Sequence, residues 1–118
     1  MGVVGLAACG GGSTSTPQKP KSGQQVAKVA DIEVGKAISA NAAGNPLIVS
    51  RPSESTVACF SAICTHQGCT VQAQGNKAVC PCHGSVYNAL TGAVIQTPAP
   101  APLVKVAVTV KNGEIVTS

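Results

Sequence analysis

Alternating apolar and polar positions are the clearest structural signal in the sequence. From residue 104 to 110 every second position is a valine, with lysine, alanine and threonine between them. This period of two is typical of a strand that buries one face, so a strand is expected over 103–110. Asn112-Gly113 follows, and both residues accept the positive φ of a two-residue turn. The pattern therefore predicts a hairpin between 103–110 and 114–117.

Other short apolar and β-branched runs predict strands at 26–34, 47–50, 56–63, 77–80 and 92–95. No segment after Gln25 shows a convincing helical period. The chain has 118 residues, which is enough for one domain, expected at 26–118, plus tails. The fold class is predicted to be all-β, an antiparallel strand framework with a small lobe, residues 64–88, inserted in it.

The composition limits the size of the hydrophobic core. Apolar residues are mostly Ala and Val, with one Phe, one Tyr and no Trp. Small domains with such cores usually need a disulfide or a metal site. The net charge of +4 comes from scattered lysines and one arginine, without a basic block, so nucleic acid is not an expected partner.

The amino-terminal residues have a different character. Residues 1–9 are short, apolar and uncharged and end in Leu6-Ala7-Ala8-Cys9, which resembles a bacterial lipoprotein processing site with Cys9 as the lipid attachment point. The run is short and lacks a basic region, so it is interpreted as a truncated signal segment whose start lies upstream. Residues 10–25 are rich in Gly, Ser, Thr, Pro and Lys and are expected to be a flexible linker.

Two hexapeptides carry the chemistry. They are Cys64-Thr65-His66-Gln67-Gly68-Cys69 and Cys80-Pro81-Cys82-His83-Gly84-Ser85, and they hold both histidines and four of the six cysteines of the chain. Two cysteines and two histidines on paired loops suit a [2Fe-2S] cluster in which two His replace two Cys on one iron. The two extra cysteines could then join each other.

With these motifs, residues 26–118 resemble the Rieske iron–sulfur domain. The resemblance also covers Tyr87 and the proline-rich stretch 98–102. It implies a Rieske-type antiparallel β-sandwich with a small cluster-binding subdomain and one [2Fe-2S] cluster. The implied ligands are Cys64 and Cys80 on one iron and His66 and His83 on the other.

The resemblance also implies roles for the residues around the ligands. Cys69 and Cys82 would form a disulfide between the loops, which indicates an oxidising, extracytoplasmic setting. Ser85 would donate a hydrogen bond to a bridging sulfide, and Tyr87 to a cysteine sulfur. His ligation makes the oxidised cluster nearly neutral and so raises its reduction potential. Cys59 is expected to be a buried, apolar thiol.

Alternatives to this interpretation are a structural zinc site built from the same ligands and a pure disulfide framework of six cysteines. Within the iron–sulfur reading, the favoured function is electron transfer by a lipid-anchored carrier, or small oxidoreductase subunit, on the extracytoplasmic face of a bacterial cell membrane. The iron–sulfur subunit of a quinol–cytochrome c reductase is the next, and a Rieske ferredoxin for an oxygenase the third. Expected partners are a quinol or quinol-oxidising complex, a cytochrome, or an oxidoreductase large subunit.

Overall fold

The computed structural model describes residues 21–65, 68–82, 84–97 and 101–118. Within these ranges the chain is built from short antiparallel strands in three sheets, with one 3-10 turn at Val29–Asp31. The predicted all-β class is therefore confirmed. None of the helical structure in the described ranges is long and apolar enough to cross a membrane.

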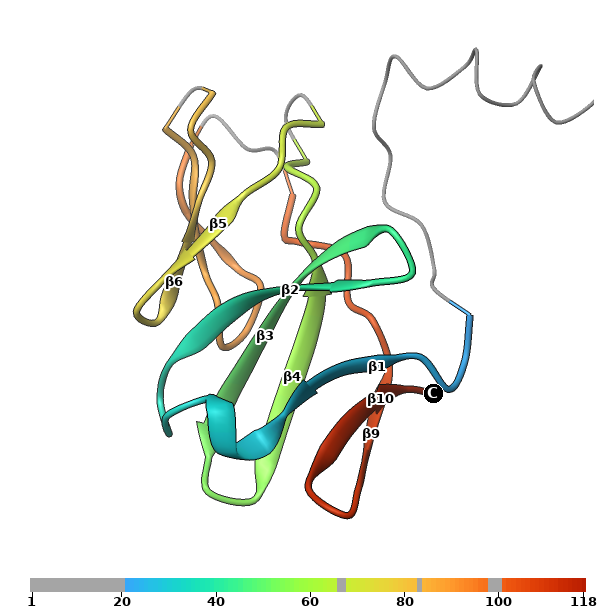
Figure 1. Cartoon of the computed structure of the whole chain (residues 1–118). Coiled ribbons are helices and arrows are strands. Elements are labelled where there is room, and N and C mark those ends of the chain that lie inside the picture. Colours follow the sequence, from blue (N-terminus) through green and yellow to red (C-terminus); the bar gives the residue numbers. More distant parts are fainter. Residues whose placement is uncertain (1–20, 66–67, 83, 98–100) are drawn as a thin grey trace, which may run out of the picture.

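Two of the sheets form the base of the molecule (Figure 1). One has the order β1-β10-β9 and the other β2-β3-β4. Their bounds are β1 Gln25–Lys28, β2 Ala37–Ala42, β3 Asn45–Ser53, β4 Thr56–Ser61, β9 Val108–Lys111 and β10 Glu114–Thr117. Apolar side chains from both sheets share one buried cluster, with Ile32, Leu47, Val49 and Ile115 among its members. This shared core joins the two sheets.

The third sheet forms the lobe, with the order β5-β6-β7-β8. Its strands are β5 Gln72–Gln74, β6 Lys77–Val79, β7 Val86–Asn88 and β8 Val94–Gln96. A second buried cluster runs from Ile48 and Phe60 of the base to Ala78 and Tyr87 of the lobe. Figure 1 shows the loop after β4 and the loop between β6 and β7 at the same end of the molecule, opposite the β3–β4 and β9–β10 turns.

Gly92 lies close against the Phe60 ring. A Cβ at this position would lie 2.7 Å from Cε1 of Phe60 on β4, and the φ of Gly92 is +84°. Both the space and the backbone conformation therefore require glycine here. The Gly92 carbonyl also accepts a hydrogen bond from the N–H of Leu103 at 2.9 Å.

The predicted hairpin at Asn112-Gly113 is confirmed. Both residues have positive φ, 52° and 77°, and β9 and β10 pair directly across the turn. The strand expected over 103–110 was wrong in extent, because the segment changes sheets. Val104 and Val106 bond to β4, through Ser61 and Cys59, and only 108–111 pair with β10.

The strand expected over 26–34 is also shorter than predicted. It ends at Lys28 and gives way to the 3-10 turn. At its other end, the N–H groups of Gly23 and Gln24 bond to Thr117, so pairing with the carboxyl-terminal strand begins inside the segment expected to be a linker. Three strands, β2, β5 and β7, were missing from the prediction.

Candidate metal centre

The two motif loops have the same backbone hydrogen bonds. In the first loop the Cys64 N–H bonds to the Cys69 carbonyl at 2.6 Å, and the Gly68 N–H bonds to the Cys64 carbonyl at 3.0 Å. In the second, the corresponding bonds join Cys80 with Ser85 at 2.8 Å and Gly84 with Cys80 at 3.0 Å. Each fifth residue is a glycine with positive φ, 74° and 78°. The loops are thus structural counterparts, as the paired hexapeptides suggested.

A disulfide joins the two loops. It links Cys69, the last residue of the first loop, to Cys82, the third of the second, with a Cα–Cα distance of 6.5 Å. This pairing, implied by the family resemblance, is confirmed. Cys82 is exposed and Cys69 is partly buried, so the disulfide lies at the surface end of the lobe.

Cys64 and Cys80 occupy equivalent first positions of the loops and are both buried, at 3% and 1% exposure. Both residues belong to the core cluster that also contains Val71, Ala78 and Tyr87. The Sγ atoms of Cys69, Cys80 and Cys82 lie within 4.8 Å of one another. Two of these three form the disulfide, and Cys80 is the member of the group that lies outside it.

Tyr87 brings its hydroxyl to the first cysteine. The Tyr87 OH lies 3.3 Å from Cys64 Sγ and 3.0 Å from both the N–H and the Oγ1 of Thr65. Thr65 Oγ1 donates its own proton to the Ala101 carbonyl at 2.7 Å, so toward Tyr87 it can only accept. The Tyr87 proton is therefore shared between Cys64 Sγ and Thr65 Oγ1.

Burial is the main cause that raises the pKa of Tyr87, and the hydrogen bond with Cys64 raises it further, while the contacts with Thr65 lower it. The phenol therefore stays protonated and can act as a donor at neutral pH. Thr65 was not among the residues singled out from the sequence. Its contacts reach across 22 and 36 residues of chain, and a local motif carries no signal for them.

Ser85 has a buried hydroxyl that needs a partner. Its side chain is 0% exposed, and its Oγ makes no hydrogen bond within the part of the chain that the structure describes. Leaving a buried hydroxyl unsatisfied costs about 1–3 kcal/mol. A sulfide or thiolate bound beside Cys80 would accept this bond, so the residues present fit an iron–sulfur cluster. A second such hydroxyl, Ser50 on β3, belongs to the base.

Charged side chains are scarce around the two loops. Between Glu54 and Lys105, Lys77 is the one residue of the sequence with a full charge at neutral pH. Hydroxyl and backbone N–H groups of this segment can therefore act on Cys64 and Cys80 through hydrogen bonds.

Several predicted residues lie outside the described ranges. They are the two proposed imidazole ligands, the lipid attachment site and part of the proline-rich stretch, namely His66, His83, Cys9, Pro98 and Pro100. Cys59, on β4, is 1% exposed, which confirms the prediction of a buried thiol.

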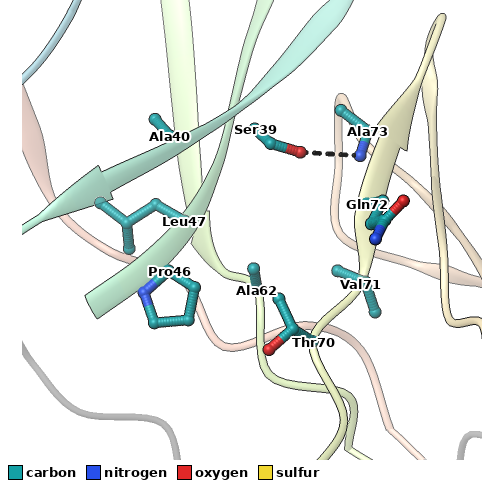
Figure 2. A pocket seen from close by; sticks show the side chains of 9 residues that line it. All are labelled: Ser39, Ala40, Pro46, Leu47, Ala62, Thr70, Val71, Gln72 and Ala73. Atoms are coloured by element: carbon teal, nitrogen blue, oxygen red, sulfur yellow. Dashed lines mark hydrogen bonds between the residues drawn. The ribbon is translucent and has the colours of Figure 1, made fainter. Parts of the chain in front are cut away.

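A cavity of about 330 Å³ lies at the junction of base and lobe. Figure 2 shows its nine lining residues, with Leu47 and Pro46 on one side and Val71 and Gln72 on the other. The Ser39 hydroxyl accepts a hydrogen bond from the Ala73 N–H at 3.1 Å across it. None of the nine side chains is titratable, so the cavity offers no general acid or base for catalysis.

Residues 22–111 match the family model of the Rieske [2Fe-2S] domain. The chain belongs to the Rieske family. This membership decides for the iron–sulfur reading over the zinc and disulfide-framework alternatives. One [2Fe-2S] cluster is the cofactor of the Rieske domain, and the function of the domain is electron transfer through it.

Curated relatives of this Rieske protein include subunits of the cytochrome b6-f complex. Iron-sulfur subunit 1 from chloroplasts of Nicotiana tabacum is 34% identical over 115 residues, which cover 91% of this chain and 50% of the relative. The subunit from Synechococcus sp. (strain RCC307) is 46% identical over 79 residues, 64% of this chain and 44% of the relative. The chain thus spans about half the length of these relatives or less.

Among solved structures, the cyanobacterial plasma membrane Rieske protein PetC3 from Synechocystis PCC 6803 superposes with a TM-score of 0.68. It is 29% identical, and the match covers 80% of this chain and 97% of PetC3. The ferredoxin of carbazole 1,9a-dioxygenase from Nocardioides aromaticivorans IC177 has the same fold, with a TM-score of 0.61, 22% identity, and coverage of 83% and 98%.

Proposed function

We propose that the chain is a lipid-anchored, high-potential Rieske carrier, or a small oxidoreductase subunit, that works on the extracytoplasmic face of a bacterial membrane. The observation that carries the proposal is that each of the two loops with a buried cysteine also has a buried hydroxyl associated with it. Tyr87 reaches Cys64 Sγ. The Ser85 backbone closes the loop that starts at Cys80, and the Ser85 Oγ has no hydrogen-bond partner among the described residues.

Cys64 and Cys80 would hold one iron, and His66 and His83 the other. When bound, the cluster accepts and releases one electron. The ligand cysteines are buried and their neighbours are uncharged, so an added negative charge is stabilised mainly by nearby donors. A hydroxyl that donates to sulfur favours the electron-rich state, which raises the reduction potential.

The imidazoles are proposed to take up the proton that leaves a quinol together with an electron. This role comes from the family resemblance, in which the outer nitrogens of the two histidines are exposed. The electron would pass on to a cytochrome or to a larger oxidoreductase subunit. The relatives named as cytochrome b6-f subunits support redox partners of this kind.

The anchor and location rest on two supports. The sequence up to Cys9 resembles a lipoprotein processing site, and two or more acyl chains there would hold the protein stably at the bilayer. The surface disulfide fits an oxidising compartment. A relative described as a plasma membrane protein is consistent with this placement.

Two other functions have specific support. The cytochrome b6-f relatives favour a subunit of a quinol-oxidising complex, the second candidate. The fold shared with a dioxygenase ferredoxin makes an oxygenase ferredoxin the third candidate. The family resemblance counts against it, because a disulfide between the two loops is typical of the quinol-oxidising members and not of such ferredoxins.

Film voltammetry of the purified, cluster-loaded protein across pH tests the proposal. A high potential that falls as the pH rises through the histidine pKa values is expected for proton-coupled, quinol-chain chemistry. A low potential that stays flat near neutral pH would contradict the proposal and would assign the chain to the ferredoxin class.

A further inference from the structure

A third sulfur atom lies against the disulfide of the cluster lobe. Cys80 Sγ is within 4.8 Å of the sulfur atoms of both Cys69 and Cys82, which are bonded to each other. Cys80 is buried at 1% exposure, so a thiol reagent in solution reaches it poorly. The neighbouring disulfide, in contrast, lies next to Cys80 inside the protein. Thiol–disulfide exchange proceeds by attack of one sulfur on a bonded pair, and this placement brings the three sulfur atoms of such an exchange together.

We infer that, in the protein without its cluster, Cys80 exchanges with this disulfide. The Cys80 sulfur attacks Cys69 Sγ, a Cys69–Cys80 bond forms, and the Cys69–Cys82 bond breaks. Cys82 leaves as the thiolate and takes up the proton that Cys80 gave to solvent. One disulfide and one thiol are present before and after, so the step needs no oxidant or reductant.

Attack on Cys69 is favoured over attack on Cys82 by the rings that result. A Cys80–Cys82 bond would close a ring across Pro81 alone, whose φ is fixed by the pyrrolidine. A Cys69–Cys80 bond closes a ring of nearly the same length as the native disulfide, whose partners are 13 residues apart. The chain-entropy contribution of the new bond is therefore close to that of the old one.

The product differs from the native form in a way that matters for loading. Cys80 is consumed, and the thiol released is that of Cys82, which is exposed. Bound iron at Cys80 would keep its sulfur from the attack. This consequence rests on the ligand role proposed for Cys80, whereas the exchange itself does not.

The test starts from the full, cluster-loaded chain. Iron is removed with a chelator under anaerobic conditions, the native protein is treated with iodoacetamide, and peptide mass spectrometry locates the label and the disulfide. We expect label on Cys82 and a Cys69–Cys80 linked peptide. The two Ser variants each lack a proposed cluster ligand and are therefore labelled as purified. Cys80→Ser should lose both signals. Cys64→Ser is the matched control, since it removes another proposed ligand but keeps the attacking sulfur, and it should retain both.

Two results would overturn the inference. One is a chelated wild-type protein that keeps only the Cys69–Cys82 peptide. The other is label on Cys69 in place of Cys82, which contradicts the direction of attack. The ligand role of Cys80 is tested separately, by reconstituting the cluster in protein that has exchanged. Recovery of the full [2Fe-2S] spectrum would contradict that role and would leave the exchange established.

Discussion

At the scale of single residues, the shared proton of Tyr87 is the feature with most consequence. Its hydroxyl accepts from the Thr65 N–H and has two acceptors within 3.3 Å for its one proton, Cys64 Sγ and Thr65 Oγ1. More negative charge on the Cys64 sulfur makes it the better acceptor of the two. The hydrogen bond therefore strengthens when an electron arrives, which is the property that a donor needs in order to raise a potential.

Removing either hydroxyl should lower the reduction potential without loss of the cluster. Tyr87→Phe and Ser85→Ala each delete one donor, and a difference of about 1–2 kcal/mol between the redox states corresponds to a drop of about 40–90 mV for one electron. Film voltammetry, after the [2Fe-2S] spectrum is confirmed, measures the shift.

Ser50→Ala is the matched control for this measurement. It removes the other buried hydroxyl that has no hydrogen bond within the described ranges, and this hydroxyl lies on β3 in the base. Its potential should equal that of the wild type. Unchanged potentials in both Tyr87→Phe and Ser85→Ala would show that neither side chain donates to the cluster.

At the scale of elements, the turn between β7 and β8 fixes the lobe on the base through the Gly92–Phe60 contact. Gly92→Ala should destabilise the protein by about 2–4 kcal/mol, because a Cβ would press on the Phe60 ring and the residue would keep a positive φ. Urea unfolding of the purified protein measures the change.

Gly75→Ala separates the cost of the contact with Phe60 from the cost of the positive φ. Gly75, in the β5–β6 turn, also has a positive φ, +62°, but a Cβ there would meet nothing within 4 Å. Its cost should be about 1–2 kcal/mol, from the backbone conformation alone. Equal losses in the two variants would mean that the contact with Phe60 relaxes freely and does not hold the lobe.

The same scale shows which elements a sequence can predict. The Asn112-Gly113 hairpin was found because its signal is local, as was the pairing of the motif loops. The sheet change near residue 107 was missed, because alternation in 104–110 reports which side chains face inward but not which strand lies alongside. β2 was missed since its sequence, AISANA, is mostly small and polar and becomes a strand through pairing with β3.

The same difference between local and long-range signals applies to the candidate metal centre. The resemblance carried by the two short motifs implies Cys64 and Cys80 as ligands and Cys69–Cys82 as a disulfide, and the structure confirms the disulfide. The role of Thr65 depends on Ala101, 36 residues further along the chain, and becomes visible only when the segment after β8 lies against the first loop.

At the scale of the whole molecule, the buried thiol of Cys59 links stability to pH. Burial raises the pKa of Cys59 to about 12 from 9.0, and a hydrogen bond from the Phe60 backbone offsets part of the rise. In the unfolded chain the thiol ionises near its ordinary pKa, while in the folded protein it stays neutral. The stabilising contribution is therefore full below about pH 9 and is lost as the pH rises toward 12.

Cys59→Ala should remove this part of the pH dependence. The variant loses some stability at every pH because a small cavity forms, but its free energy of unfolding should fall less steeply above pH 9 than that of the wild type. Urea unfolding of both proteins from pH 7 to 10, under anaerobic conditions, measures the two slopes. Parallel slopes would contradict the assignment.

The place where the chain leaves and re-enters the base has a consequence for how such proteins diversify. β4 ends at Ser61, and the chain returns at Val104, whose carbonyl accepts the Ser61 N–H at 2.8 Å. The whole lobe is thus an insertion whose two ends are one hydrogen bond apart. Insertions with adjacent ends can lengthen, shorten or be exchanged while the host sheets keep their pairing. Redox properties and partner surfaces in the lobe can then change in evolution largely independently of the base that carries them.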